Sequence, residues 1–381
     1  MEIPAQDAAH MARAVELAGR GHGTTSPNPV VGCVVLDAAG QVAGEGFHAY
    51  AGGPHAEVAA LAQAGERARG GTAYVTLEPC DHTGRTGPCS LALLDAGIAR
   101  VVVAVADPNP KAAGGAARLR AHGVAVTTGV LTGEAERVNE EWLTYARLGR
   151  PHVTWKFAAA LDGRSAAEDG TSQWITSPEA RADVHRLRAA SDAIVAGVGT
   201  ILADDPSLTA RPASSAPASS GPTSSGPTSS APAARTPLRV VIDTAARTPQ
   251  GARVLDDRAP TLVAVAEDAE TGLKADLLRL PRHPDGLDLH ALLRELAARE
   301  VVSVFVEGGP TLAGSFVRQG LVDRVVAYLA PALLGSGRAA LGAAGVRTIG
   351  EIHRLTFDDF SLIGPDIRLI ARPTTQPGRE K

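Results

Sequence analysis

The sequence predicts an α/β protein made of two domains. Its 381 residues are about two domains' worth of chain, since a domain commonly holds about 100 to 200 residues. Through residues 5–148, segments of helical periodicity alternate with short apolar segments, which is typical of a sheet layered with helices. A second alternation of the same kind begins at Pro151. We therefore expect one domain over residues 1–148 and another over 149–373.

In the first domain, amphipathic segments predict helices, and apolar runs bounded by turn residues predict strands. The expected helices are Ala5–Gly19, His55–Ala68 and Pro88–Ala96, and the expected strands are Gly32–Leu36, Val42–Phe47, Thr72–Leu77 and Val101–Ala106. The first two strands are joined by a short Gly-containing turn, which predicts a hairpin. The domain closes near Trp142–Gly149.

The same patterns apply to the second domain. They predict strands Val153–Ala158, Ala193–Ala196, Leu238–Ile242, Thr261–Ala266 and Val301–Glu307, and helices Ser177–Ala189 and His290–Arg299. An insertion at about residues 212–235 consists almost entirely of Ser, Pro, Ala, Gly and Thr. Such a segment has no large apolar side chains to bury. We interpret it as a disordered insertion within the second domain, because the segments on its two sides belong to one α/β pattern.

Composition excludes several classes of protein. With 44% hydrophobic and 20% charged residues, the chain has the composition of a soluble globular protein. Proteins that bind nucleic acid usually carry a clustered excess of basic residues. The net charge of this chain is −4, so we expect no nucleic-acid partner. The apolar stretches are strand-length, far short of the roughly 20 residues of a membrane span, so we expect no membrane partner.

The acidic, amphipathic N-terminus does not match a secretory signal, and three cysteines cannot form a disulfide framework. We expect a cytoplasmic protein.

One pattern of residues points to a metal and to a reaction. His55 begins a predicted helix, Cys80 follows a predicted strand after Pro79, and Cys89 begins the next predicted helix. One imidazole and two thiolates are three zinc ligands, and a catalytic zinc keeps a fourth position for water, whose pKa it lowers to about 7. Glu57, two residues after His55, is placed to act as general acid and base. The pattern is similar to the H-x-E and P-C-x-x-C signature of zinc-dependent cytidine, adenosine and nucleobase deaminases. It predicts Zn²⁺ and a hydrolytic deamination.

The cysteine spacing departs from that signature. Residues 81–88 separate the two cysteines, where most of the superfamily has two residues, and they add His82 and Arg85 near the metal. A guanidinium suits phosphate binding. An alternative is a closed structural zinc site with His82 as fourth ligand, in which Glu57 has no role. Cys33 lies in an apolar strand, and we interpret it as a small buried hydrophobe.

Three loops are further candidates for ligand binding. Two of them, Ser26–Pro29 and Asp107–Pro110, each place a polar side chain between prolines, which would hold it rigidly for hydrogen bonding to a heterocycle. Ordinary turns have the same composition. The third, Glu307–Thr311, is a glycine-rich segment between a strand and a helix, where backbone N–H groups can approach a phosphate. No G-x-G-x-x-G fingerprint follows a strand.

The resemblance extends along the whole chain. The segments SPNPVVGCVV, GFHAYAGGPHAE, YVTLEPCDHTGRTGPC, VADPNP, KFAAALDGRSA, SQWITSPEAR, GTILADDPSLTAR and VFVEGGPTLAGSF occur in this order. From about Met11 to Arg372 the chain resembles the bacterial bifunctional riboflavin-biosynthesis deaminase–reductases. The resemblance implies an N-terminal cytidine-deaminase-like three-layer domain and a C-terminal dihydrofolate-reductase-like domain. It implies zinc-dependent deamination of 2,5-diamino-6-ribosylamino-4(3H)-pyrimidinone 5′-phosphate, then NADPH reduction of the ribosyl group to give 5-amino-6-(5-phospho-D-ribitylamino)uracil.

The resemblance also implies roles for individual residues. Zinc would be held by His55, Cys80 and Cys89, with Glu57 as proton shuttle. The implied substrate-binding residues are Asn28, His48, His82, Arg85, Asp107 and Asn109 in the deaminase and Ser172, Arg188, Leu208, Arg211 and Glu307 in the reductase. The implied NADPH-binding residues are Ala158, Trp174, Thr200, Asp204, Thr244, Gly309, Pro310, Thr311, Leu312, Ala313, Gly314 and Ser315. Lys156 and Asp162 are either a structural ion pair or catalytic. Relatives associate through the reductase domain, so a homodimer or homotetramer is expected.

Two other functions share the zinc motif. A nucleic-acid base deaminase with an accessory domain would use the same chemistry, but the near-neutral charge and the second phosphate loop argue against it. A non-enzymatic regulator that binds NADPH or a pyrimidine would keep the fold and have no need of Glu57. Ammonia release that depends on Glu57 distinguishes an enzyme from such a regulator.

Overall fold

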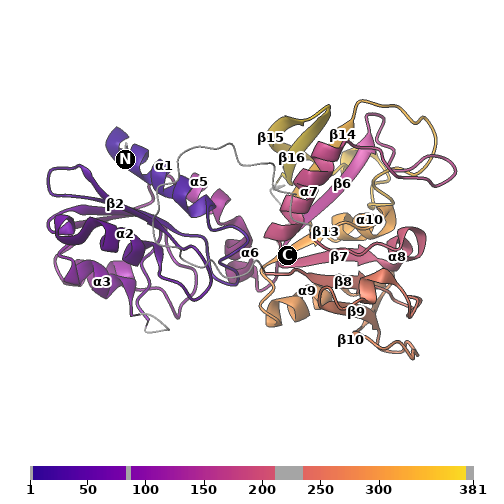
Figure 1. The fold of residues 1–381 in the computed structure, drawn as a ribbon, viewed down its shortest axis with the longest axis horizontal. Helices are drawn as coiled ribbons and strands as arrows, with labels where there is room; N and C mark the ends of the chain where they lie inside the picture. The colour runs from indigo at the N-terminus through magenta and orange to yellow at the C-terminus, as the bar shows by residue number, and fades with distance from the viewer. Residues whose placement is uncertain (1–2, 83–86, 211–234, 375–381) are drawn as a thin grey trace, which may run out of the picture. The chain divides into compact units, whose positions relative to one another are not determined.

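The computed structural model describes residues 3–82, 87–210 and 235–374. The expected disordered insertion, Arg85 and Arg211 lie outside the described residues. The described chain forms two compact units, one up to Arg150 and one from Pro151 onward (Figure 1). No helix in these described ranges combines the length and apolar character of a membrane span.

The first unit is built on a five-stranded sheet with strand order β2-β1-β3-β4-β5. β1 runs antiparallel to β2 and β3, whereas β3, β4 and β5 are parallel. The strands are β1 (Gly32–Leu36), β2 (Val42–Phe47), β3 (Thr72–Leu77), β4 (Arg100–Val105) and β5 (Ala125–Thr128). The helices are α1 (Ala5–Gly19), α2 (Ala56–Ala64), the short 3-10 helix η1 (Gly65–Ala68), α3 (Cys89–Asp95), α4 (Gly115–Ala121), α5 (Thr132–Val138) and α6 (Glu140–Leu148).

Glycines bring helices against both faces of this sheet. A Cβ atom at Gly32 would lie 2.0 Å from the Ala14 carbonyl oxygen of α1, so only glycine fits there. On the other face, Cβ atoms at Gly44 and Gly46 of β2 would lie 2.2 Å and 2.5 Å from backbone oxygens of α2. Because successive strand residues point to opposite faces, α1 and α2 sandwich the sheet. The unit is the expected three-layer, cytidine-deaminase-like domain.

The second unit contains a nine-stranded sheet with order β10-β9-β8-β7-β13-β6-β14-β16-β15. The strands from β10 to β14 in that order are parallel, and β16 and β15 close one edge antiparallel. The strands are β6 (His152–Ala160), β7 (Ala193–Gly197), β8 (Leu238–Ile242), β9 (Thr261–Ala266), β10 (Asp276–Leu280), β13 (Ser303–Val306), β14 (Arg324–Ala330), β15 (Leu355–Ile363) and β16 (Asp366–Pro373). A separate small hairpin pairs β11 (Arg282–His283) with β12 (Gly286–Leu287).

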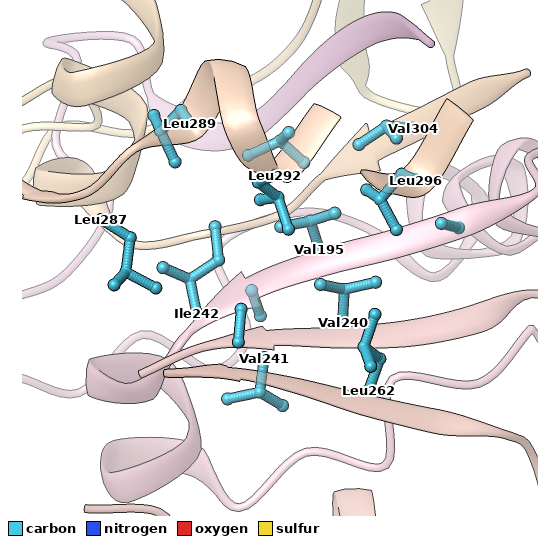
Figure 2. Close-up of a cluster of buried hydrophobic side chains, with 14 of the residues drawn as sticks. Val195, Val240, Val241, Ile242, Leu262, Leu287, Leu289, Leu292, Leu296 and Val304 are labelled. Atoms are coloured by element: carbon cyan, nitrogen blue, oxygen red, sulfur yellow. The ribbon is translucent and has the colours of Figure 1, made fainter. Parts of the chain in front are cut away.

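Helices cover both faces of this larger sheet as well. They are α7 (Pro178–Ala190), α8 (Val198–Asp204), α9 (Leu289–Ala298) and α10 (Pro310–Arg318), with short 3-10 helices η2 (Arg253–Leu255) and η3 (Ile349–Glu351). Figure 2 shows Leu292 and Leu296 of α9 directed at the strands that carry Val195 and Val304. On the opposite face, α7 packs against Phe305 and the β14 side chains. The parallel strands are thus buried on both faces, as their apolar sequences predict.

The structure differs from the predicted elements in two respects. The helix expected over His55–Ala68 is divided, because Gly65 takes a positive φ of 55° and ends α2. Several elements had no counterpart among the expected ones, and they include α4, β5, α5, α6, α8, β10, the small hairpin β11–β12 and the strands β14, β15 and β16. Of the last three, β14 extends the parallel part of the sheet, and β16 and β15 add an antiparallel edge.

Candidate active sites

The three predicted zinc ligands come together at one end of the first sheet. His55 caps the N-terminus of α2, Cys80 follows β3, and Cys89 is the first residue of α3. His55 Nδ1 lies 3.2 Å from Cys89 Sγ and 3.6 Å from Cys80 Sγ. A tetrahedral zinc with bonds of about 2.1 Å to nitrogen and about 2.3 Å to sulfur would hold such atoms about 3.6 Å apart. The donor set therefore fits zinc in both chemistry and spacing.

Electrostatics favour a metal-binding thiolate at this site. A hydrogen bond with the Cys89 thiol, supported by His55, lowers the pKa of Cys80 to about 4. The Cys80 sulfur also accepts the Cys89 backbone N–H, 3.4 Å away. The contact with Cys80, together with burial, raises the pKa of the Cys89 thiol. Contact between the two sulfurs and with His55 thus favours a thiolate at this pair, and thiolate is the form that metals bind.

Glu57 lies beside these ligands without being one of them. Its side chain is in the first turn of α2 and is only 3% exposed. Burial raises the pKa of the Glu57 carboxyl above its ordinary value, although the nearby His55 charge opposes this shift. A carboxyl with a raised pKa can both accept and return a proton near neutral pH. The position fits the acid/base role that the sequence predicts.

His82 does not complete the metal site. Among the described residues, the group whose metal-binding atoms lie within 4.8 Å of one another consists of His55, Cys80 and Cys89. The His82 side chain is exposed. Within the described ranges no fourth protein ligand joins this group, which favours a catalytic site over the closed structural alternative.

Asn28 and His48 form a hydrogen-bonded pair in the first unit. His48 is buried, and its Nδ1 donates to the Pro54 carbonyl oxygen at 2.9 Å. Burial lowers the pKa of His48, so the ring is neutral and its Nε2 is an acceptor. The Asn28 Nδ2 amide donates to that Nε2 at 3.3 Å. The amide orientation of Asn28 is therefore set by a neutral histidine.

Asp107 and Asn109 lie in the loop after β4, at the carboxyl end of that strand. The Asp107 carboxylate accepts the Asn109 backbone N–H at 2.8 Å, and Asn109 Oδ1 accepts the backbone N–H of Lys111 at 3.1 Å. These local bonds give the loop a defined shape. Burial, followed by the neighbouring Glu78 charge, raises the pKa of Asp107. Glu78 lies in the segment YVTLEPCDHTGRTGPC, directly before Pro79 and Cys80, but the sequence predicts no role for it.

In the second unit, Arg188 of α7 and Glu307 after β13 form a partly buried ion pair. Arg188 Nε donates to Glu307 Oε1 at 2.8 Å, and the second guanidinium nitrogen donates to Oε2. Arg188 also donates to the carbonyl oxygen of Thr209, next to the buried Leu208. Burial alone would raise the pKa of Glu307, but the charges of Arg188 and Lys156 bring it below its ordinary value. Three predicted substrate positions are thus gathered in one place.

Lys156 belongs to this charged group, whereas Asp162 does not. Burial lowers the pKa of the Lys156 amine, opposed by the nearby Glu307 charge. The Asp162 carboxylate instead accepts backbone N–H bonds from Leu334 and Gly335 at 3.1 Å and 2.6 Å. The electrostatic partner of Lys156 is Glu307, and Asp162 shapes a loop.

Most of the predicted NADPH residues lie at the carboxyl ends of parallel strands, where α/β proteins bind ligands. Ala158 is near the end of β6, Thr200 and Asp204 are in α8 after β7, and Thr244 follows β8. Residues 309–315 include the N-cap and most of α10, after β13. Ser172 and Trp174 lie in the loop before α7, where the exposed Trp174 ring stacks under Arg181 at 4.4 Å.

Two glycines precede α10, close to Leu312 and Thr200. A Cβ atom at Gly308 would lie 2.5 Å from Leu312 Cδ2, and one at Gly309 would lie 3.7 Å from Thr200 Oγ1. Gly309 is the N-cap of α10 and contributes no capping side chain. The N-terminus of α10 therefore lies near Thr200 without a capping side chain, and the first N–H groups of a helix can bind a phosphate.

These two sites define a protein with a zinc deaminase region joined to a reductase-type domain. Residues 4–105 match the family described as the cytidine and deoxycytidylate deaminase zinc-binding region. Residues 151–369 match the RibD C-terminal domain. The chain belongs to the RibD family of bifunctional riboflavin-biosynthesis proteins, whose members carry out deaminase and reductase steps. The predicted fold class and the zinc site on His55, Cys80 and Cys89 are confirmed.

Relatives match over nearly their whole length. The riboflavin biosynthesis protein RibD of Escherichia coli K12 is 45% identical over 96% of this chain and 98% of its own. RibD of Mycobacterium tuberculosis is 45% identical over 94% of this chain and 95% of its own. Among solved structures, Acinetobacter baumannii RibD aligns with a TM-score of 0.84 and 38% identity, covering 97% of this chain and 99% of that one. A Thermotoga maritima protein, titled a diaminohydroxyphosphoribosylaminopyrimidine deaminase/5-amino-6-(5-phosphoribosylamino)uracil reductase, aligns with a TM-score of 0.81 and 33% identity over 97% and 99%.

Proposed function

We propose that this chain deaminates 2,5-diamino-6-ribosylamino-4(3H)-pyrimidinone 5′-phosphate and then reduces the ribosyl group of the product with NADPH, giving 5-amino-6-(5-phospho-D-ribitylamino)uracil. The observation that carries the proposal is that the metal-binding atoms of His55, Cys80 and Cys89 lie close together, beside the buried Glu57 carboxyl. The name of the Thermotoga maritima protein, which describes the same two reactions, supports it.

In the deaminase site, Glu57 moves the protons. His55, Cys80 and Cys89 would hold the zinc ion, which when bound would supply an activated water at neutral pH. The Glu57 carboxylate takes a proton from the attacking water and returns it to the amino group as the carbon–nitrogen bond breaks. The products are ammonia and the pyrimidine carbonyl, so one water is consumed and no oxidant or reductant is needed. The raised pKa of Glu57 suits a group that must hold this proton between the two transfers.

The remaining deaminase residues hold the substrate. Because neutral His48 accepts the Asn28 amide hydrogen, the Asn28 side chain is held in one orientation for hydrogen bonding to the pyrimidine. Asp107 and Asn109 offer further polar groups from their loop. His82 and Arg85 follow Cys80 in sequence, and we assign them to the substrate as well. A guanidinium at position 85 suits the 5′-phosphate.

In the reductase site, bound NADPH would supply the hydride for the ribosyl carbon. We assign its phosphates to the Gly309–Ser315 segment with Thr200, where the first N–H groups of α10 lie. Reduction also needs a proton at the ribosyl oxygen. Lys156 is suited to supply it, because burial lowers the pKa of its amine toward neutrality. Glu307 and Arg188 hold each other in place beside Lys156 and orient the substrate.

We also propose that the chain forms a homo-oligomer through its reductase unit. Apolar side chains of β15 are exposed, among them Phe357, Phe360 and Leu362. A cavity of about 540 Å³ adjoins this strand, with Trp155 and Leu369 in its lining. Exposed apolar surface of this kind commonly marks a protein interface. A second copy of the chain is the partner that the family resemblance implies.

A coupled assay tests the two reactions. The zinc-loaded protein is given the diaminopyrimidinone ribosyl phosphate and NADPH, and ammonia and NADPH are followed together. We expect ammonia release first and NADPH oxidation only after it. The matched variant Glu57→Gln should lose ammonia release by a factor of about 100 or more while keeping its zinc and its oxidation of NADPH with the deaminated substrate.

Each departure from this result identifies a different error. Ammonia without NADPH oxidation would contradict the reductase assignment alone. Turnover retained by Glu57→Gln would remove Glu57 from the mechanism. Competition by a single-stranded oligonucleotide would favour the nucleic-acid deaminase. If neither ammonia release nor NADPH oxidation is seen, the proposed substrate is wrong.

A further inference from the structure

Glu78 is a carboxylate with unusual partners. It follows β3 and is half-buried, and its own backbone N–H pairs with the Val105 carbonyl oxygen of β4 at 2.8 Å. Its side-chain oxygens accept three backbone N–H groups from the segment after β4. Oε2 accepts from Asp107 at 3.2 Å, and Oε1 accepts from Gly114 at 3.2 Å and from Ala116 at 3.0 Å. One side chain thus holds both the beginning and the end of the segment Asp107–Gly114.

The end of this segment needs such a partner. Helix α4 begins at Gly115, and its N-cap, Gly114, has a φ of 114° and no side chain to cap the helix. Glu78 supplies the missing acceptor from a different strand, since it binds the N–H groups of the N-cap and of the second helical residue. A Cβ atom at Gly115 would lie 1.9 Å from the Pro79 carbonyl oxygen. The start of α4 is therefore pressed against the residue between Glu78 and Cys80.

A second carboxylate, on the other side of Cys80, fastens the same segment. The Asp81 backbone N–H donates to the Ala112 carbonyl oxygen at 2.8 Å, and the Asp81 side chain pairs with Arg118 of α4 and accepts a hydrogen bond from Ser90 at 2.5 Å. Contacts to the segment therefore come from residues on both sides of the zinc ligand.

We propose that Glu78 is a positioning residue of the deaminase, whose carboxylate sets the place of Asp107 and Asn109 relative to the zinc ligand Cys80. The inference rests on the proposed function, in which Asp107 and Asn109 bind the pyrimidine. Glu78 touches neither metal nor substrate in this role. It acts through the backbone of the loop, and both of its oxygens must be acceptors, because each faces an N–H group.

The variant Glu78→Gln tests this role. It keeps the size of the side chain but turns one acceptor oxygen into an NH₂ group that faces an N–H donor. We expect the KM for deamination to rise about tenfold and kcat to change by less than about threefold, with full zinc content. NADPH oxidation with the deaminated substrate should not change. The matched control Glu66→Gln, which removes one exposed carboxylate from the same unit, should match the wild type in every reading.

Hydrogen exchange supplies a second reading that needs no substrate. In the wild type, the amides of Asp107, Gly114 and Ala116 should exchange slowly, and in Glu78→Gln at least about tenfold faster. A Glu78→Gln variant with full zinc content and a KM within twofold of the wild-type value would overturn the proposal. A fall in kcat that is explained by loss of zinc would overturn it too.

If Glu78→Gln does not fold, the wild type alone decides. Slow exchange of the three amides in the wild type supports the proposal, and fast exchange overturns it. A wild type that releases no ammonia contradicts the proposed function, whereas the exchange result still decides whether Glu78 holds the loop.

Discussion

At the scale of single residues, the three cysteines have different environments that determine their roles. Cys80 and Cys89 meet His55, whereas Cys33 is fully buried in β1 among apolar side chains. Burial strongly raises the pKa of the Cys33 thiol, and its sulfur is not in the group of metal-binding atoms that His55, Cys80 and Cys89 form. Zinc binding should depend on two cysteines and not on the third.

Substitution of each cysteine checks this. Cys80→Ser and Cys89→Ser should lose most of the bound zinc, while Cys33→Ala should keep one zinc per chain and lose about 1 kcal/mol of unfolding free energy through reduced packing. Metal analysis of the purified variants and urea unfolding are the measurements. Loss of zinc in Cys33→Ala, with its fold intact, would contradict the ligand set.

The zinc ligands could be predicted from sequence because their types and spacing reflect the chemistry of the metal. The hydrogen-bond partners of Glu78 and the pairing of Arg188 with Glu307 could not be predicted, since these partners lie 29 to 119 residues away along the chain. In addition, the partners of the Glu78 side chain are backbone N–H groups, which leave no residue pattern. The neutral state of His48 likewise depends on burial and on the Pro54 carbonyl oxygen, neither of which leaves a sequence motif.

At the scale of elements, helix α1 is fastened to the sheet through a buried carboxylate. Asp7 of α1 accepts two hydrogen bonds from Arg100 of β4, at 2.9 Å and 2.6 Å, and one from the Tyr74 hydroxyl of β3 at 2.8 Å. The Arg100 bond, against the opposing effect of burial, lowers the pKa of Asp7 below its ordinary value. The ionised form of Asp7 is thus the one that stabilises the fold.

The variant Asp7→Asn tests this contact through its dependence on pH. We expect it to lose about 2 kcal/mol of unfolding free energy at pH 7. A carboxyl whose folded-state pKa is lowered stabilises the protein above its unfolded-state pKa of about 3.9 and loses that contribution as the pH falls through the lower folded-state value. The difference between wild type and variant in urea unfolding should therefore shrink below about pH 4. A difference that stays constant from pH 7 to pH 3 would show that the charge of Asp7 has no part in it.

Elements with strong periodicity of their own were predictable, and α1, β1, β2, β3, β8 and β9 have the predicted bounds. Helix α4 was not, because its capping acceptor is Glu78 from another strand. The edge strand β15 was not either, since its mostly exposed residues lack the alternation of buried and exposed positions that identifies a strand. Local pattern predicts an element only where that element is stabilised locally or buried on a regular face.

At the scale of the whole molecule, the exposed apolar residues of β15 predict self-association. Phe360 is 78% exposed, and replacing it with Asp puts a charge where a partner subunit would bury an apolar ring. We expect the wild type to sediment as a dimer or tetramer at micromolar concentration and Phe360→Asp to sediment as a 39.0 kDa monomer. The control Leu148→Asp changes a 62% exposed apolar residue of the first unit and should leave the assembly intact. A monomeric wild type, or a Phe360→Asp variant that stays assembled, would contradict the proposed interface.

The glycines of β2 have a consequence for how this enzyme can diverge. Gly44 and Gly46 let α2, which begins next to His55 and carries Glu57, rest directly on the strand backbone. Not even alanine fits at either position, because its Cβ atom would collide with the backbone of α2. A substitution there would push α2 away from the sheet and displace His55 and Glu57. Substitutions in the loops near the metal, such as residues 26–29 and 107–114, leave the contact between β2 and α2 unchanged. We therefore expect new substrate preferences to arise in these loops.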